Sequence, residues 1–136
     1  MSPPFAILDI DHVVLRAADP ARLEAFYRDV LGCPVEKRQE AIGLTQLRAG
    51  RALIDIVSAQ SEPPGSHANG SDRKNMDHLC LRVDPFDVKA IYRHLDHHGV
   101  SYGEVALRYG AEGRGPSIYI KDPDGNRVEL KGPASE

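Results

Sequence analysis

One internal repeat constrains the fold of this chain more than any other feature. Residues 10–35 read IDHVVLRAADPARLEAFYRDVLGCPV, and residues 76–101 read MDHLCLRVDPFDVKAIYRHLDHHGVS. Asp11-His12 aligns with Asp77-His78, and the copies continue nearly without gaps. Self-similarity of this kind predicts two copies of one supersecondary unit that share an architecture.

Each copy is expected to begin with a strand that leads into a helix. In the strands, Val13 and Leu15, and then Leu79, Leu81 and Val83, alternate with a second set of side chains. Asp19-Pro20 and Asp84-Pro85 suit the N-cap and first helical position. Gly32 and Gly99 are expected to end the two helices.

Several short strands follow each helix. We expect strands at 44–48 and 52–57 in the first copy and at 116–121 and 127–131 in the second, with a turn at Asp122-Pro-Asp-Gly125. The predicted fold class is therefore α+β, with two repeated βαβββ modules that form a concave mixed sheet with helices on its outer face.

These modules define one predicted domain over residues 1–136. Module one spans about 8–57, a linker rich in Ser, Pro and Gly spans 58–75, and module two spans about 76–131. The glycine-rich stretch 109–115 is expected to be a loop that acts as a lid over the sheet.

Composition narrows the class of partner. The 136 residues carry 17 Lys and Arg against 20 Asp and Glu, a net charge of -3, with the two signs interspersed. This balance argues against nucleic acid and anionic membranes and leaves small molecules. The chain shows no apolar span or signal segment, and its two cysteines are too few for a disulfide framework. We therefore expect a soluble, cytoplasmic protein with reduced thiols.

Strand alternation places a set of metal-binding side chains on the sheet face opposite the helices. His12 and His78 lie on that face, as do Asp55 between two isoleucines and Glu129 between Val128 and Leu130. Two histidines and one or two carboxylates suit one divalent transition metal, Zn, Ni, Mn, Co or Fe(II). Asp55 is the weaker ligand because its side chain is one methylene shorter than that of Glu129.

The same face carries candidate substrate-binding groups. Ser117, Tyr119 and Lys121 alternate with isoleucines along one strand, and these groups suit an anionic or oxygen-rich substrate. Arg16 suits bidentate binding of a carboxylate or phosphate, as does Arg82. Cys80 shares the face of His78, where it is either a soft ligand or reactive thiol lining the site, or a small buried apolar filler.

The DH-x-x-LR opening of both copies, the ALIDIV strand and the SIYIKDPDGNRVEL segment resemble the vicinal oxygen chelate superfamily, over about residues 8–131. This superfamily includes glyoxalase I, fosfomycin resistance transferases, extradiol dioxygenases and bleomycin resistance proteins, and the chain is most similar to small glyoxalase-domain proteins. The resemblance implies that His12, His78 and Glu129 are metal ligands. Asp55 falls where glyoxalase I has a fourth ligand, and Arg16 where that enzyme contacts a thiol co-substrate.

The preferred hypothesis is a metal-dependent, glyoxalase-like lyase or isomerase whose substrate is chelated through two oxygens, with Glu129 or Asp55 as the catalytic proton carrier. The alternatives are an Fe(II) extradiol-type ring-cleaving dioxygenase and a non-catalytic drug-binding protein of the bleomycin-resistance type. The resemblance also implies pairing of modules within one chain or across a dimer, and we expect a homodimer.

Overall fold

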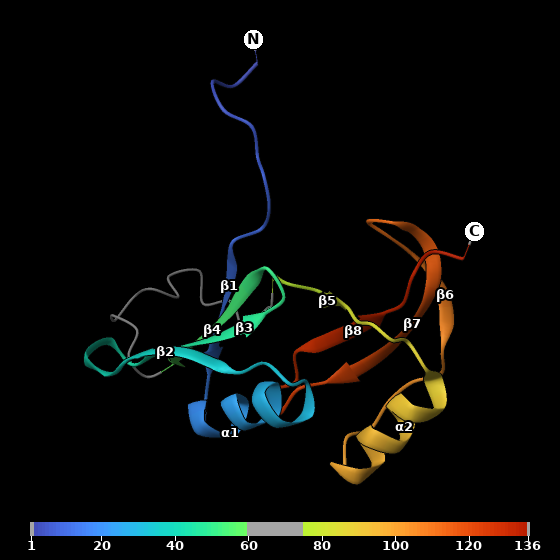
Figure 1. The fold of residues 1–136 in the computed structure, drawn as a ribbon. Coiled ribbons are helices and arrows are strands. Elements are labelled where there is room, and N and C mark those ends of the chain that lie inside the picture. The colour runs from blue at the N-terminus through green and yellow to red at the C-terminus, as the bar shows by residue number, and fades with distance from the viewer. Residues whose placement is uncertain (1, 60–74, 136) are drawn as a thin grey trace. The chain divides into compact units, whose positions relative to one another are not determined.

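The computed structural model describes residues 2–59 and 75–135, which form two compact units. The units are Met1–Pro63 and Pro64–Glu136, and each holds one copy of the repeat (Figure 1). Most of the predicted linker lies outside the described residues, but Ser58, its first residue, belongs to the last strand of module one. Among the described residues, no helix is long and apolar enough to cross a membrane.

Both units have the same element order and the same sheet topology. Module one contains β1 (His12–Ala17), α1 (Pro20–Ala25), β2 (Val35–Gln39), β3 (Leu44–Ala49) and β4 (Ala52–Ser58). Module two contains β5 (Leu79–Arg82), α2 (Val88–His97), β6 (Ala106–Gly110), β7 (Gly113–Lys121) and β8 (Arg127–Lys131). The strand orders are β1-β4-β3-β2 and β5-β8-β7-β6, with the first pair of each sheet parallel and the others antiparallel. The predicted α+β class with two βαβββ modules is confirmed.

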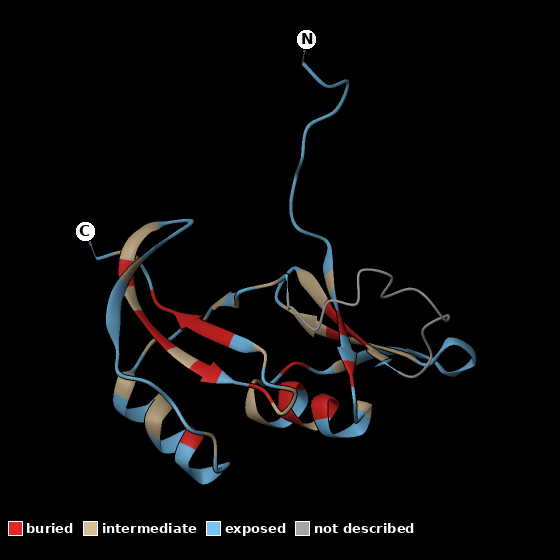
Figure 2. Ribbon diagram, turned by 180° about the vertical axis from the view of Figure 1, so that it is seen from behind, coloured by how far each residue is buried: buried red, intermediate tan, exposed pale blue. Residues whose placement is uncertain are grey.

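Strand alternation separates the two faces of each sheet as predicted. One face carries the isoleucines and leucines that form the core of the unit, shown as buried segments in Figure 2. In module one these include Leu15, Leu47, Ile54 and Ile56, and in module two Ile118, Ile120, Val128 and Leu130. The opposite face of each sheet carries the histidine of the repeat, and we call it the site face.

Helix α1 begins where the sequence predicts. The Asp19 side chain accepts a hydrogen bond from the backbone N–H of Arg22, and Pro20 is the first helical residue. A single π-helical turn, Phe26–Val30, extends the helix, and Gly32 follows with a positive φ. Helix α1 contacts β1 and β4.

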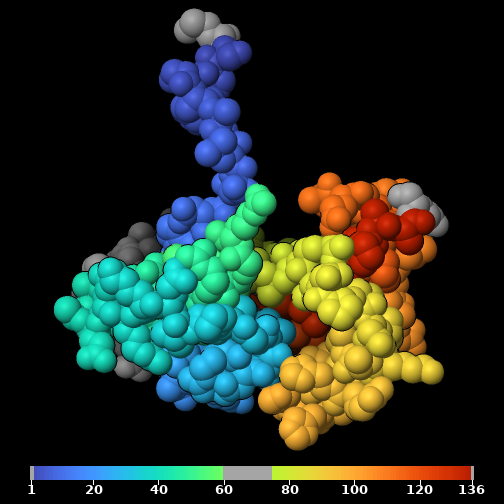
Figure 3. All heavy atoms as spheres, viewed as in Figure 1, coloured from blue at the N-terminus to red at the C-terminus, as the bar shows by residue number. Residues whose placement is uncertain are grey.

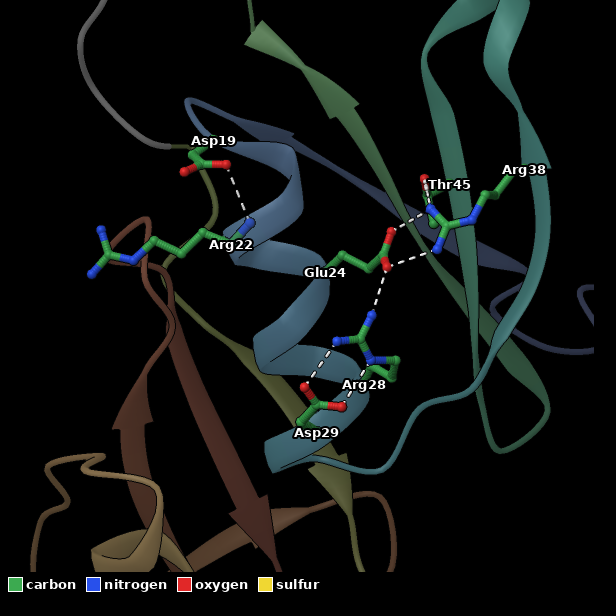
Figure 4. Close-up of polar contacts among 7 residues, drawn as sticks. All are labelled: Asp19, Arg22, Glu24, Arg28, Asp29, Arg38 and Thr45. Carbon is green, nitrogen blue, oxygen red and sulfur yellow. Dashed lines mark hydrogen bonds and ion pairs between the residues drawn. The ribbon is translucent and has the colours of Figure 1, made fainter.

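A buried carboxylate ties α1 to the neighbouring strand β2. Glu24 accepts hydrogen bonds from Arg28 at 2.8 Å and from both terminal nitrogens of Arg38 at 2.6 and 2.8 Å (Figure 4). The Arg38 guanidinium, followed by Arg28, lowers the pKa of Glu24. This cluster stabilises the outer part of module one, away from His12.

The predicted start of the second helix is wrong. The N-cap of α2 is Asp87, which accepts a hydrogen bond from the N–H of Ala90, and not Asp84. The ring of Phe86 packs so closely on Gly132 that a Cβ at Gly132 would lie 2.7 Å from it. This contact holds the chain beyond Pro85 against the end of β8 and delays the helix. Gly99 follows the helix with a positive φ, as predicted.

Two tight connections hold the strands of module two together. The β7–β8 turn is confirmed, since Asp122 accepts hydrogen bonds from the N–H groups of Asp124 and Asn126. The prediction of a lid at 109–115 is wrong, because these residues form the β6–β7 hairpin, with Gly110 paired to Gly113.

The residues before β1 form an extended segment, visible at the blue end of the chain in Figure 3. Its apolar side chains are exposed. Phe5, Ile7, Leu8 and Ile10 are each more than two-thirds exposed, at 69, 86, 89 and 78%. Single exposed apolar residues are common on protein surfaces, but a run of four in six residues is a candidate contact surface.

Candidate functional site

Module two brings a histidine and a buried carboxylate into direct contact. Glu129 on β8 pairs with Cys80 on β5, and His78 precedes Cys80 by two residues on the site face. The Nε2 atom of His78 lies 3.0 Å from Oε1 of Glu129. Glu129 is only 4% exposed, and its Oε2 has no hydrogen-bond partner among the described residues. Because an unpaired buried carboxylate oxygen is costly to desolvate, this atom favours a cation or a donor as its partner.

Module one contains the equivalent pair in a looser form. Nε2 of His12 lies 4.0 Å from Oδ2 of Asp55, which is buried between Ile54 and Ile56. Gln46, the partner of Asp55 on β3, donates its Nε2 to both carboxylate oxygens at 3.2 Å. Both oxygens of Asp55 are therefore hydrogen-bonded, unlike those of Glu129. This difference agrees with the weaker metal role expected for Asp55, which stays a prediction.

The aspartate before each histidine orients the imidazole. Nδ1 of His12 lies 2.6 Å from Asp11, and Nδ1 of His78 lies 2.6 Å from Asp77. The hydrogen bond to Asp11 raises the pKa of His12, and the hydrogen bond from His78 lowers the pKa of Asp77. Metal-bound histidines commonly use such a carboxylate to fix the tautomer and leave Nε2 for the metal. The repeated Asp-His dipeptide was the available sequence signal for this role, which the sequence analysis did not assign.

These donors fit a divalent transition metal. Imidazole nitrogen and carboxylate oxygen are its usual ligands, and Glu129 supplies a buried oxygen that lacks a partner. Within each module one buried carboxylate faces the Nε2 of the histidine, and residues 2–59 and 75–135 contain no group of three His, Cys, Asp or Glu side chains placed to hold a metal. A set of three or four ligands needs both pairs, and that combination stays a prediction.

Tyr119 is a predicted substrate residue that lies beside the histidine–carboxylate pair of module two. It is paired with Glu129 across β7 and β8, and its ring packs edge-on against His78 with 5.4 Å between the ring centroids. Ser117, two residues earlier, is fully buried, and its hydroxyl accepts a hydrogen bond from Arg108 at 2.9 Å. Ser117 therefore positions Arg108 in this structure.

The other predicted substrate residues differ in their surroundings. Arg16 on β1 and Lys121 at the end of β7 are exposed. The Nε of Arg82 donates to Glu112 at 2.5 Å and its Nη1 donates to the carbonyl of Val83, so these contacts fix the orientation of the guanidinium. Partial desolvation and the Glu129 carboxylate raise the pKa of Cys80 to about 11. The thiol therefore stays protonated at neutral pH. Cys80 is exposed, which argues against a buried filler, and its place in the substrate site stays a prediction.

Two arginines on the site face were not identified from the sequence. The guanidinium carbons of Arg108 on β6 and Arg127 on β8 each lie 4.3 Å from the centre of the Tyr119 ring. Because β6 and β8 flank β7 on opposite sides, the ring lies between the two cations. Arg108 lies just before the predicted loop at 109–115, in a strand that was not predicted from the sequence.

Comparison with known proteins agrees with this architecture. Residues 9–130 match the family described as the Glyoxalase/Bleomycin resistance protein/Dioxygenase superfamily. The chain therefore belongs to this superfamily, as its sequence motifs indicate.

Several relatives resemble the chain over most of its length. Virulence protein STM3117 of Salmonella typhimurium is 28% identical over 127 residues, which cover 89% of this chain and 81% of that protein. Its crystal structure has a TM-score of 0.78 over 96% of this chain and the whole of that one. Mouse mitochondrial methylmalonyl-CoA epimerase is 28% identical over 141 residues, covering 96% of this chain and 76% of the epimerase. Lactoylglutathione lyase from Agrobacterium tumefaciens is 26% identical, with a TM-score of 0.66 and 96% of both chains covered.

Proposed function

We propose that this protein is a metal-dependent lyase or isomerase of the glyoxalase type that acts on a small molecule with two adjacent oxygens. The observation that carries the proposal is the buried Glu129 carboxylate, which contacts His78 through one oxygen and leaves the other without a partner. A relative named as a lyase and another named as an epimerase support a reaction of this general class.

In this proposal, His12, His78 and Glu129 hold one divalent ion, Zn, Ni, Mn, Co or Fe(II), with Asp55 as a further and weaker ligand. When bound, the metal supplies Lewis-acid polarisation of the two substrate oxygens. Asp11 and Asp77 keep the Nε2 atoms of the two histidines directed toward the carboxylates, and this preorganisation lowers the cost of assembling the site.

The residues of the chain would carry the proton. A carboxylate oxygen of Glu129, or of Asp55, accepts the proton from the substrate carbon next to the carbonyl and returns it to the neighbouring atom, so the reaction has no net proton change. Burial of both carboxylates keeps water away from this step. Arg16 would contact the anionic end of a thiol co-substrate, if the reaction uses one.

Metal content and metal-dependent thermal stabilisation test this proposal. Wild type is compared with His78→Ala and Glu129→Ala across Fe(II), Mn, Ni, Co and Zn, with His97→Ala on the exposed end of α2 as the matched control. We expect one bound ion and a raised Tm in wild type and in the control, and loss of both in the two site variants. Equal stabilisation of all four proteins, or of none, would contradict the metal site.

The preferred metal then separates the classes of reaction. A preference for Ni, Co or Zn directs the substrate screen to thiol hemiacetals, whereas a preference for Fe(II) directs it to catechols and the dioxygenase alternative. The absence of a response to any ion would leave non-catalytic ligand binding as the better account.

We further propose a homodimer that works in the cytoplasm. The exposed apolar segment before β1 supports self-association, since burying Phe5, Ile7, Leu8 and Ile10 against a second copy removes apolar surface from water. The two free cysteines, Cys33 and Cys80, agree with a reducing compartment.

A further inference from the structure

Three side chains on the site face of module two form a stack that the proposed chemistry does not use. The Tyr119 ring lies between the guanidinium groups of Arg108 and Arg127, each 4.3 Å from the ring centre. A guanidinium that stacks on an aromatic ring keeps its N–H groups at the edge of its plane, where they remain available to oxygen ligands. The stack therefore presents two oriented cationic groups beside His78, which contacts the same tyrosine.

One nitrogen of each guanidinium is fixed by a hydrogen bond, to the buried Ser117 in one case and to Asp77 in the other. Nη1 of Arg108 donates to the carbonyl and hydroxyl of Ser117, both at 2.9 Å, and Nη2 of Arg127 donates to Asp77 at 3.0 Å. These are the hydrogen bonds of the two guanidiniums within the described part of the chain. Both groups therefore retain further donors, and their orientation is set before any ligand arrives.

The local charge on this face is positive. Alternation along β6, β7 and β8 places Arg108, Lys121, Arg127 and Lys131 on the face that carries Glu129. Lys131 is only 4% exposed, and its amine has a backbone carbonyl at 3.5 Å as its hydrogen-bond partner. Several cations with one buried carboxylate among them attract an anionic group, because each cation raises the local potential.

We propose that Arg108 and Arg127, stacked on either side of Tyr119, bind a carboxylate or phosphate group of the substrate. The inference rests on the proposed function, since it names the substrate of that site as an anion that carries a charged group in addition to its two chelating oxygens. Arg108, whose side chain donates to Ser117 and stacks on Tyr119 among the described residues, is the specificity-determining residue. Arg127 also supports Asp77, so its loss affects the imidazole of His78 as well.

Binding of simple anions to metal-free protein tests the inference without any activity assay. Malonate and inorganic phosphate are titrated calorimetrically into wild type, Arg108→Gln and Arg108→Lys, with neutral malonamide as the ligand control. Arg93→Gln is the matched protein control, because Arg93 is an exposed arginine on α2. Thermal unfolding of each variant confirms that it is folded.

We expect wild type and Arg93→Gln to bind at least one of the two anions, with an affinity that falls as salt is added. Arg108→Gln should bind it at least about tenfold more weakly, a loss equivalent to about 1.4 kcal/mol, and Arg108→Lys should lie between the two. The anion that binds more tightly identifies the group as carboxylate or phosphate. Equal binding by Arg108→Gln and wild type, equal loss in Arg93→Gln, or equal binding of malonamide would overturn the inference.

The metal titration of the same variants separates this inference from the proposed function. Metal-dependent stabilisation should persist in Arg108→Gln, because the guanidinium of Arg108 donates its hydrogen bonds to Ser117 and to neither proposed ligand among the described residues. If wild type binds metal but its anion affinity does not depend on Arg108, the inference fails and the proposed function stands. If wild type binds malonate or phosphate through Arg108 but no metal, the proposed function fails and the anion site stands.

Discussion

Replacing Glu129 with methionine should stabilise the metal-free protein and abolish its response to metal. The side chain is buried on the site face, where Cys80 and Tyr119 are its neighbours on the adjacent strands, and its Oε2 lacks a partner among the described residues. A buried polar group without a hydrogen bond costs about 1–3 kcal/mol of stability. Methionine has a similar length and removes this cost, while His78, whose side chain is 30% exposed, can be hydrated in place of its contact with Oε1. The metal-free variant should therefore gain about 1–2 kcal/mol.

The metal-loaded protein should behave in the opposite way. Wild type with free metal at about 100 times its Kd gains about 2.7 kcal/mol of stability, and the methionine variant gains none. Urea unfolding of both proteins, with and without metal, gives the four free energies of unfolding. The control is Glu104→Met, which makes the same substitution at an exposed position. It should change neither the stability of the metal-free protein nor its stabilisation by metal.

The stability of the metal-free variant and its gain in stability on adding metal test different steps of the reasoning. A metal-free methionine variant less stable than wild type by more than about 1 kcal/mol would show that the carboxylate is compensated in the folded protein. Metal stabilisation that survives in this variant would remove Glu129 from the ligand set.

Three further predictions test other parts of the structure. Asp77→Asn should weaken metal binding roughly 10- to 100-fold, because it removes the carboxylate that orients the imidazole beside it, and calorimetric metal titration measures the change. Glu24→Gln should lower the stability at pH 7 by about 2 kcal/mol. This is less than the sum of its three hydrogen bonds, because water can solvate the exposed arginines. The control is Glu36→Gln, which breaks an exposed ion pair and should have little effect. The folded-state pKa of Glu24 lies below its ordinary value of 4.5, so its contribution to stability is present above pH 4.5 and is lost as the pH falls through the folded-state pKa. Urea unfolding at pH 7 and at low pH measures this loss. Equal destabilisation by Glu24→Gln at both pH values would contradict it. Ile7→Asp should shift sedimentation from dimer to monomer, and an unchanged sedimentation coefficient would exclude the segment before β1 from the interface.

Periodicity and repetition were sufficient to predict the sheet faces and the histidine–carboxylate pairs. Glu129 and Asp55 each stand in an apolar strand, and period-two alternation places them on the face of the repeated histidine. Helix α1 was equally accessible, because its cap is a local contact between Asp19 and the next turn. Both kinds of prediction depend only on residues close in sequence or on one strand.

Features that depend on contacts between residues far apart in the sequence could not be predicted from local patterns. Asp84-Pro85 has the same local pattern as Asp19-Pro20, but the packing of Phe86 on Gly132 moves the helix start to Asp87. The β6–β7 hairpin is rich in glycine, a composition that is also typical of loops. A Cβ at Gly110 would lie 3.0 Å from Lys131, so this glycine also accommodates a lysine from two strands away.

The two copies of the repeat have diverged where their chemistry differs. A Glu in module two reaches its histidine at 3.0 Å and keeps one oxygen without a partner, whereas an Asp in module one stops at 4.0 Å and gives both oxygens to Gln46. One methylene thus separates a carboxylate that favours a cation from one whose hydrogen bonds are already made. Because the Arg108–Tyr119–Arg127 stack lies beside the first kind, the proposed metal ligand with an open oxygen and the cations proposed to hold an anionic substrate come from the same module. Module two is therefore the part of the chain in which substitutions should change catalysis and substrate choice together.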